Sequence, residues 1–228
     1  IKRVELEDGR IFQSRSVILT PGGRPRSLNI PGEDQFKGTG ISYCATCDGD
    51  FFTGKEVVVV GGGNSALEEA VALTQYASRV TIVHQFDHFQ AFKHAVEEAQ
   101  KNKKIEFIME SELRGFFGNG KLEKVEIEHL PTGRKSELLT DGTFIFAGYQ
   151  PNTESLEGLV QLNERKEIAV DGDMKTNIDG VFAAGDCITK KYRQVTTAVA
   201  DGTIAALSAA RYLSEKQVKT EEIFEQEA

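Results

Sequence analysis

Along the chain, short apolar runs alternate with longer amphipathic segments. This pattern of strands and helices predicts an α/β protein. The clearest strand is Glu56–Val60, a run of β-branched residues of the kind that is buried in a parallel sheet. A glycine-rich turn at 61–64 ends this strand, and apolar residues then recur at helical spacing over 65–77. Another apolar strand is predicted at 79–83. These pieces together predict a βαβ unit.

Shorter elements are predicted on both sides of this βαβ unit. Before it, over residues 1–19, we expect two short strands that are joined at Asp8-Gly9 and end in the apolar run 17–19. After it we expect, in chain order, a helix at 91–102, a strand at 105–109, a hairpin of 122–130 with 135–139, strands at 142–147 and 181–184, and a long helix at 196–213. Turn-rich segments at 21–32 and 148–152 are the predicted domain boundaries.

Composition and charge narrow the function classes. The chain has 228 residues, of which 39% are hydrophobic and 27% charged, as in ordinary globular proteins. Its net charge of -8 argues against general binding to nucleic acid or to anionic membranes, because both require a basic surface. No apolar run approaches the roughly 18 residues of a membrane span, so we expect a cytoplasmic protein. The chain begins without Met on an alternating, strand-like pattern, which we interpret as part of a longer protein.

The turn after the first βαβ strand has the spacing of a dinucleotide-binding turn. Gly61 permits the tight turn, Gly63 lets the backbone approach a pyrophosphate, and Ala66 allows close packing of the helix on the strand. The N-terminus of the following helix offers free N–H groups to phosphates. The turn lies between a predicted strand and a predicted helix, and a second strand follows the helix. We therefore prefer this interpretation to a tight turn in a ligand-free domain.

The end of the second βαβ strand normally decides between NAD and NADP. An acidic residue there binds the ribose 2′-hydroxyl of NAD, and arginines bind the 2′-phosphate of NADP. This chain instead has the segment 84–90, His-Gln-Phe-Asp-His-Phe-Gln, which matches neither pattern. Asp87 could reach a ribose hydroxyl or could cap the next helix. His84 and His88 are expected on the loop surface.

A pair of cysteines two residues apart, Cys44 and Cys47, precedes the dinucleotide turn. A structural zinc site needs four ligands, but only Cys187 remains and no histidines lie at zinc spacing, so we expect no metal. Redox chemistry fits better, because a C-x-x-C pair can exchange with another disulfide. Asp48 follows directly; it is either a proton donor and acceptor for the thiolate or a polar turn residue.

A third feature is the apolar strand at 181–184, which runs into Gly185-Asp186. Asp186 would lie at the carboxyl end of a strand, where open α/β sheets bind ligands. Arg193 and Gln194 then precede the long helix, whose positive end suits an anionic group. Cys187 is expected to be a small packing residue.

These motifs together resemble the low-molecular-weight bacterial thioredoxin reductases over nearly the whole chain. The matching segments are 44–49, 61–66, 148–153, 181–186 and 192–194. The resemblance implies a flavoprotein with two Rossmann-like domains, in which a nicotinamide domain (35–149) is inserted into an FAD domain (1–34 and 150–228). It also implies a homodimer, and an inserted domain that rotates to present either the nicotinamide or the cysteine pair to the flavin.

The resemblance also implies roles for single residues. Cys47 would exchange electrons with FAD, Cys44 would attack the disulfide of a thioredoxin-like partner, and Asp48 would be the acid/base. The implied cofactor-binding residues are Gly61, Gly63, Asn64, Ser65 and Ala66 for the nicotinamide dinucleotide, with His84 and Gln85 at the ribose position, and Asp186, Arg193, Gln194 and Val195 for the flavin.

Two departures from the family pattern matter. Gln85, Phe86 and Gln90 stand where the family usually carries arginines for the 2′-phosphate of NADPH. We therefore predict NADH, or a donor such as reduced ferredoxin, in preference to NADPH. The glycine turn that binds FAD near the start of the family's chains is absent, so we expect the chain to be truncated and to hold FAD poorly.

Two alternatives stay open from the sequence. The first is the reductase subunit of an alkyl hydroperoxide system, which has a similar core with an additional N-terminal redox domain. The second is a non-catalytic nucleotide-binding fragment with a vestigial cysteine pair.

Overall fold

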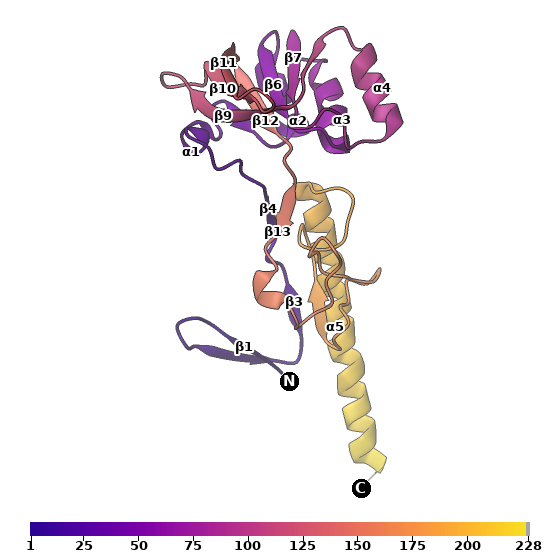
Figure 1. Cartoon of the computed structure of the whole chain (residues 1–228). Coiled ribbons are helices and arrows are strands. Elements are labelled where there is room, and N and C mark those ends of the chain that lie inside the picture. The colour runs from indigo at the N-terminus through magenta and orange to yellow at the C-terminus, as the bar shows by residue number, and fades with distance from the viewer. Residues whose placement is uncertain (227–228) are drawn as a thin grey trace. The chain divides into compact units, whose positions relative to one another are not determined.

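The computed structural model describes residues 1–226, with side chains described for residues 1–216. The chain forms two compact units (Figure 1). The inserted unit comprises Pro25–Gly148, and the flanking unit comprises Ile1–Arg24 with Tyr149–Ala228. Two short strands, β4 (Gly23–Pro25) and β13 (Tyr149–Pro151), pair with each other where the chain passes between the units.

The inserted unit is built on a five-stranded parallel sheet. Its strands, in spatial order, are β5 (Ile41–Ser42), β12 (Gly142–Ile145), β6 (Glu56–Val60), β7 (Arg79–Val83) and β8 (Ile105–Ile108). The central strand β6 is buried on both faces, which explains its uninterrupted valine run. The crossover helix α3 (Asn64–Leu73) connects β6 to its parallel neighbour β7.

Two layers cover this sheet. Helices α3 and α4 (Lys93–Lys101) lie over one face, and the antiparallel sheet of β9 (Ser111–Phe117), β10 (Lys124–His129) and β11 (Arg134–Leu139) lies over the other (Figure 1). Alternation along β6 serves both layers: Val57 and Val59 pack with α3 and α4, and Val58 packs with the residues of β9 and β10. The short helices α1 (Glu33–Phe36), α2 (Ala45–Asp48) and η1 (Gly49–Phe52) precede the sheet's central strand.

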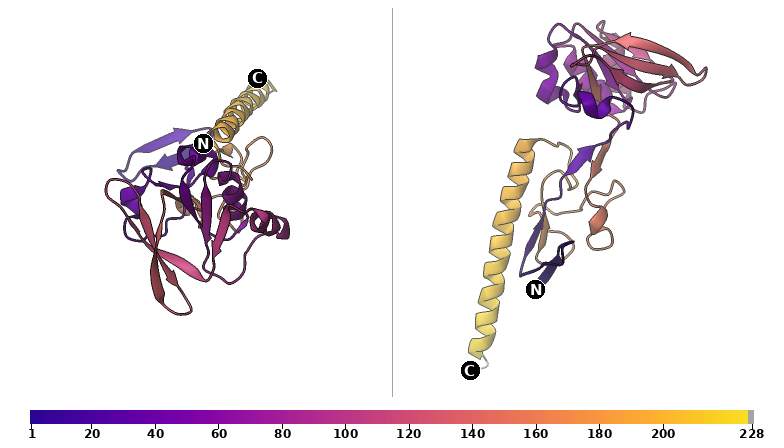
Figure 2. Two further views of the ribbon diagram at one scale, coloured as in Figure 1. Left: turned by 90° about the horizontal axis from the view of Figure 1, so that it is seen from above. Right: turned by 90° about the vertical axis from the view of Figure 1, so that its left-hand side faces the viewer.

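The flanking unit is smaller in regular structure. A hairpin of β1 (Lys2–Glu5) and β2 (Ile11–Ser14) leads to β3 (Val17–Leu19), which pairs in parallel with β14 (Val181–Ala183). A 3₁₀ turn, η2, spans Glu154–Leu156. Helix α5 (Val195–Gln226) packs on β3 and β14 (Figure 2). Its Ala205 and Ala209 are buried in one cluster with Phe182.

The predicted α/β class is confirmed, and the predicted bounds of β6 and β7 are correct. Helix α3 ends at Leu73 instead of 77, because residues 74–77 form a turn that closes onto Leu73. Helix α5 extends far beyond the predicted end at residue 213. The predictions omitted β9 and the four-residue helices α1 and α2. Among the described residues, no helix combines the length and apolar character that crossing a bilayer requires.

Candidate redox and nucleotide-binding sites

The two cysteines of the C-x-x-C motif form a disulfide at the start of α2. The Sγ atoms of Cys44 and Cys47 are 2.06 Å apart. Cys44 is the N-cap of α2, and its Sγ accepts a hydrogen bond from the backbone N–H of Cys47 at 3.1 Å. Cys47 is exposed and Cys44 is half-buried. The pair is therefore a closed disulfide at the edge of the inserted unit, and a partner molecule can reach it.

A serine connects the disulfide to the candidate acid/base. The buried Ser42 hydroxyl donates a hydrogen bond to Asp48 Oδ2 at 2.6 Å and accepts one from the backbone N–H of Cys44 at 3.1 Å. Asp48 lies at the C-terminal end of α2, directly after Cys47. Its carboxylate is therefore held beside the cysteine segment. Sequence reasoning missed Ser42, because a single serine in a short strand carries no motif.

Helix α2, which contains the disulfide, is in contact with helix α3, which follows the glycine turn. Helix α2 packs on α3, and Ala45 is buried in the same hydrophobic cluster as Ala66, Leu67 and Ala70. Helix α3 begins directly after Gly63, which is its N-cap. The inserted unit thus brings the disulfide and the glycine turn onto two helices in contact.

The three glycines of the turn, at positions 61–63, differ in how much space surrounds each Cα. Gly61 has a φ of 131°, and a Cβ there would lie 2.7 Å from the carbonyl oxygen of Phe146. A Cβ on Gly62 would lie 2.5 Å from the ring of His84. At Gly63 the nearest atom would be the carbonyl oxygen of Gln90, 3.9 Å away, so space above Gly63 stays open. This open space is what a dinucleotide turn requires for a phosphate.

The loop after β7 is bonded to this turn. The backbone N–H of Gln90 donates to the carbonyl of Gly62 at 2.8 Å, and the N–H of Phe92 donates to Asn64 Oδ1 at 2.7 Å. The loop that would contact the adenosine ribose is therefore anchored to the glycine turn. Ser65 is exposed in the first turn of α3, and Ala66 is buried beneath it.

The expectation that His84 lies on the loop surface is wrong. His84 is 5% exposed, because its ring packs against Gly62 and stacks on Phe89 at a centroid distance of 5.7 Å. Its Nε2 donates to the carbonyl of His88 at 3.1 Å. His88 is exposed as predicted, and its Nδ1 lies 2.6 Å from Asp87 Oδ1.

Burial of the His84 ring predicts a loss of stability in acid. Burial, and to a lesser extent the charge on His88, lower the pKa of His84 below its ordinary value of 6.5. Below pH 6.5 the unfolded chain therefore binds a proton that the folded protein resists, and the free energy of unfolding falls as the pH falls. His84→Gln should remove this part of the pH dependence in urea denaturation of the intact protein. The exposed control His94→Gln should retain it; equal slopes for wild type and His84→Gln would contradict the assignment.

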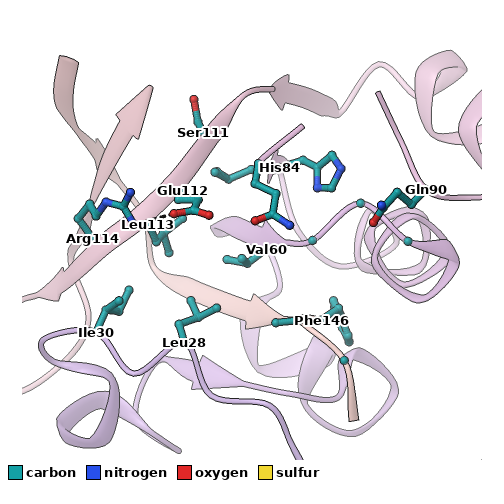
Figure 3. Close-up of a pocket in the computed structure, with 17 residues that line it drawn as sticks. Leu28, Ile30, Val60, His84, Gln90, Ser111, Glu112, Leu113, Arg114 and Phe146 are labelled. Carbon is teal, nitrogen blue, oxygen red and sulfur yellow. Dashed lines mark hydrogen bonds and ion pairs between the residues drawn. The ribbon is translucent and has the colours of Figure 1, made fainter. Parts of the chain in front are cut away.

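A pocket of about 410 Å³ opens beside the glycine turn (Figure 3). The turn, the end of β7 and the loop after it form one side, and strand β9 forms the other. Its lining includes Gly61, Gly62, Gly63, His84, Gln85, Gln90, Ser111, Glu112, Leu113 and Arg114. Glu112 and Arg114 were not predicted, because they come from β9, which lies far from the turn in sequence.

The flanking unit contains the second group of predicted residues. Asp186 follows β14 and lines a hollow of about 280 Å³ whose other walls are small residues, including Gly22, Gly23 and Gly185. Asp186 Oδ1 is buried and has no hydrogen-bond partner among the described residues. The hydroxyl of Tyr149, which the sequence did not indicate, is also buried without a hydrogen-bond partner among the described residues. Burial and the nearby Asp186 charge raise the pKa of Tyr149 to about 12.

These features fit a polar cofactor. A buried carboxylate oxygen and a buried phenol without partners need a ligand that donates and accepts hydrogen bonds. Walls of glycine let the ribityl and phosphate groups of FAD approach the backbone closely. The residues of the flanking unit are therefore compatible with FAD at Asp186.

The three residues before and at the start of α5 lie in the same unit. Arg193 pairs with Glu167, donates to the carbonyl of Asp186 at 3.3 Å, and lies over the Tyr149 ring at 4.5 Å. The backbone N–H of Gln194 donates to Thr197 Oγ1 at 3.1 Å. Val195 is 80% exposed. Cys187 is buried and reduced, as expected for a packing residue.

The structure thus divides the predicted residues between the two units. The disulfide, Asp48, the glycine turn, His84 and Gln85 belong to the inserted unit, and Asp186 with residues 193–195 belongs to the flanking unit. The cysteine pair is a disulfide, and within the part of the chain that the structure describes, no cluster of three or more His, Cys, Asp or Glu side chains could hold a metal ion.

Comparison with known proteins assigns the chain to a family. The family model described as pyridine nucleotide-disulphide oxidoreductase matches residues 1–202. The chain is 46% identical over 215 residues to a 34.2 kDa protein in the rubredoxin operon of Clostridium pasteurianum, covering 94% of this chain and 70% of that protein. It is 43% identical to the thioredoxin reductase of Bacillus subtilis, covering 90% of this chain and 66% of that enzyme. The chain thus spans about two thirds of the length of these relatives.

Solved structures agree with the sequence comparison. The thioredoxin reductase of Streptococcus pyogenes matches with a TM-score of 0.87 at 40% identity, covering 93% of this chain and 70% of that one. The enzyme of Giardia duodenalis matches with a TM-score of 0.84 at 36% identity, covering 91% and 69% of the two chains. The chain therefore belongs to the pyridine nucleotide-disulphide oxidoreductase family and, within it, to the thioredoxin reductase-type FAD oxidoreductases.

Proposed function

We propose that this chain is part of a reductase that passes electrons from NADH, through FAD and the Cys44–Cys47 disulfide, to thioredoxin or a similar small redox protein. The observation that carries the proposal is the closed, accessible disulfide on a helix that packs against the helix of the dinucleotide turn. In this proposal the inserted unit binds the nicotinamide dinucleotide and the flanking unit contributes to the FAD site. Bound FAD would supply the two-electron transfer between nicotinamide and disulfide.

The chain's own residues account for the chemistry at sulfur. Reduction of the disulfide breaks the Cys44–Cys47 bond and requires two electrons and two protons. The resemblance to the family assigns Cys47 to the flavin and Cys44 to attack on the partner's disulfide, and in the closed disulfide Cys47 is the more exposed of the two. Asp48, held by the Ser42 hydroxyl, would donate and accept the proton at the thiol. The partner leaves as a dithiol, and the Cys44–Cys47 bond forms again.

The choice of thioredoxin as partner rests on the relatives. The proteins of Bacillus subtilis and Streptococcus pyogenes are thioredoxin reductases, and we extend that substrate class to this chain. Phe51, four residues after Cys47, is 70% exposed and offers an apolar contact for such a partner. A homodimer and a cytoplasmic location complete the proposal.

NADH is proposed as the donor because the ribose loop, residues 84–90, contains no arginine or lysine for a 2′-phosphate. Gln85, Phe86 and Gln90 are neutral, and Asp87 is paired with His88. The lack of a 2′-phosphate site is also compatible with a different donor, reduced ferredoxin, which would not bind in this pocket.

Anaerobic reduction of the intact flavoprotein tests the proposal. Stopped-flow absorbance would compare flavin bleaching by NADH, NADPH and reduced ferredoxin, with thioredoxin reduction measured afterwards. We expect NADH to bleach the flavin at least about tenfold faster than NADPH at equal concentration. This ratio of rates corresponds to a difference of about 1.4 kcal/mol in activation free energy. A preference for NADPH would overturn the choice of donor, and bleaching without subsequent thioredoxin reduction would overturn the choice of partner.

A further inference from the structure

The nucleotide pocket contains a carboxylate that does not come from the ribose loop. Glu112 on β9 lines the pocket, and its side chain is 35% exposed, so a ligand can reach it. Figure 3 shows Glu112 and Arg114 on the side of the pocket formed by β9, across from His84 and Gln90. The acidic residue of the usual dinucleotide pattern follows the second strand, at the position of His84 and Gln85 in this chain.

Asp87, the acidic residue of the ribose loop, does not take the place of that ribose-binding acidic residue. Its Oδ1 lies 2.6 Å from the His88 ring, and it is not among the residues that line the pocket. The pairing with His88 lowers the pKa of the Asp87 carboxyl, so Asp87 stays ionised on the outer surface of the loop.

Arg114 is the arginine that lines the pocket, but its charge is more than balanced. Its Nη1 donates to Glu112 Oε2 at 2.6 Å, and its Nε donates to Glu128 Oε2 at 2.6 Å. One guanidinium thus lies between two carboxylates, and the group of three carries a net negative charge. The bond to Glu128 holds Arg114, and the bond from Arg114 in turn holds Glu112 Oε2, which leaves Oε1 for a ligand.

We propose that Glu112 is the residue that selects a dinucleotide with a free adenosine ribose 2′-hydroxyl and rejects one with a 2′-phosphate. This inference rests on the proposed use of NADH and identifies its structural basis. A ribose hydroxyl can donate to the fixed carboxylate, as in other NAD sites, although here the carboxylate comes from the opposite wall. A 2′-phosphate would bring negative charge against Glu112, and the neutral Gln85 and Gln90 give it no compensation.

The chain offers a matched pair of variants for the test. Glu112→Gln and Glu128→Gln each remove one negative charge and one partner of Arg114, but only Glu112 lines the pocket. Dissociation constants of NADH and NADPH would be measured by nicotinamide fluorescence on the intact protein after anaerobic reduction with dithionite, because the reduced protein no longer oxidises either dinucleotide. We expect Glu112→Gln to raise the affinity for NADPH relative to NADH about tenfold, and Glu128→Gln to change the ratio much less.

A second substitution guards against a folding defect. Glu112→Asp keeps the charge and should keep the rejection of NADPH. If Glu112→Gln and Glu128→Gln shift the ratio equally, or if neither shifts it, the assignment of Glu112 is wrong while NADH use stands. If wild-type protein binds NADPH more tightly than NADH, or binds neither, the proposed donor and this inference both fail.

Discussion

Replacing Cys44 with serine should reduce the rate of thioredoxin reduction by at least about a thousandfold, because the thiolate is the nucleophile in disulfide exchange and a serine hydroxyl does not replace it. Cys47→Ser should have an equally large effect, since it removes the other half of the disulfide that Cys44 forms. Binding of the nicotinamide dinucleotide should persist in both variants, because the glycine turn lies on α3 and not on α2. The measurement is the steady-state rate of insulin or thioredoxin disulfide reduction by the intact flavoprotein.

Cys187 supplies the control for this experiment. It is buried beside β3 and β14 and has no disulfide partner. Cys187→Ser should therefore leave turnover within a few-fold of wild type. If Cys44→Ser retains more than a tenth of the wild-type rate, the cysteine pair is vestigial and the chain is a nucleotide-binding protein without disulfide reductase chemistry.

The second large effect is expected from restoring cations to the ribose loop. The double variant Gln85→Arg, Gln90→Arg should shift the preference from NADH towards NADPH by about a hundredfold or more, since each charge-assisted hydrogen bond contributes about 1.5–3 kcal/mol. The substitution of Gln90 leaves the bond from its backbone N–H to Gly62 intact, so the loop should stay anchored to the turn. The measurement is the ratio of kcat/KM for the two dinucleotides.

The same two charges placed outside the pocket give the control. Gln75 and Gln100 are exposed residues of the inserted unit that do not line the pocket. Gln75→Arg with Gln100→Arg should leave the ratio close to wild type. An equal shift in both double variants would mean that net charge, and not a contact with the 2′-phosphate, governs the preference.

The central part of the fold could be predicted because its signals are local. Strand β6 is a continuous β-branched run that ends at glycine, and α3 repeats apolar residues at helical spacing, so both followed from adjacent residues. Helices α1 and α2 have four residues each and cannot show a helical period. Strand β9 was missed because its polar residues and Gly115 interrupt the pattern, although Leu113 and Phe116 are buried in the core.

The candidate site divides in the same way. Cys44, Cys47 and the glycine turn have characteristic spacing, and the structure places them on contacting helices. Glu112 has no such signal, because it lines the same pocket as the glycine turn only through the stacking of β9 against the parallel sheet. His84 was assigned to the surface because the identity of a residue at a strand end does not reveal that a glycine opposite leaves space for its ring.

The most direct test of the account follows the two sulfurs themselves. Intact flavoprotein would be reduced anaerobically with one equivalent of NADH, alkylated under native conditions, and analysed by mass spectrometry of the peptide that contains both cysteines. We expect both Cys44 and Cys47 to become alkylated as the reducing equivalents leave the flavin. A reduced flavin with the Cys44–Cys47 bond still closed, under conditions in which thioredoxin is reduced, would contradict it.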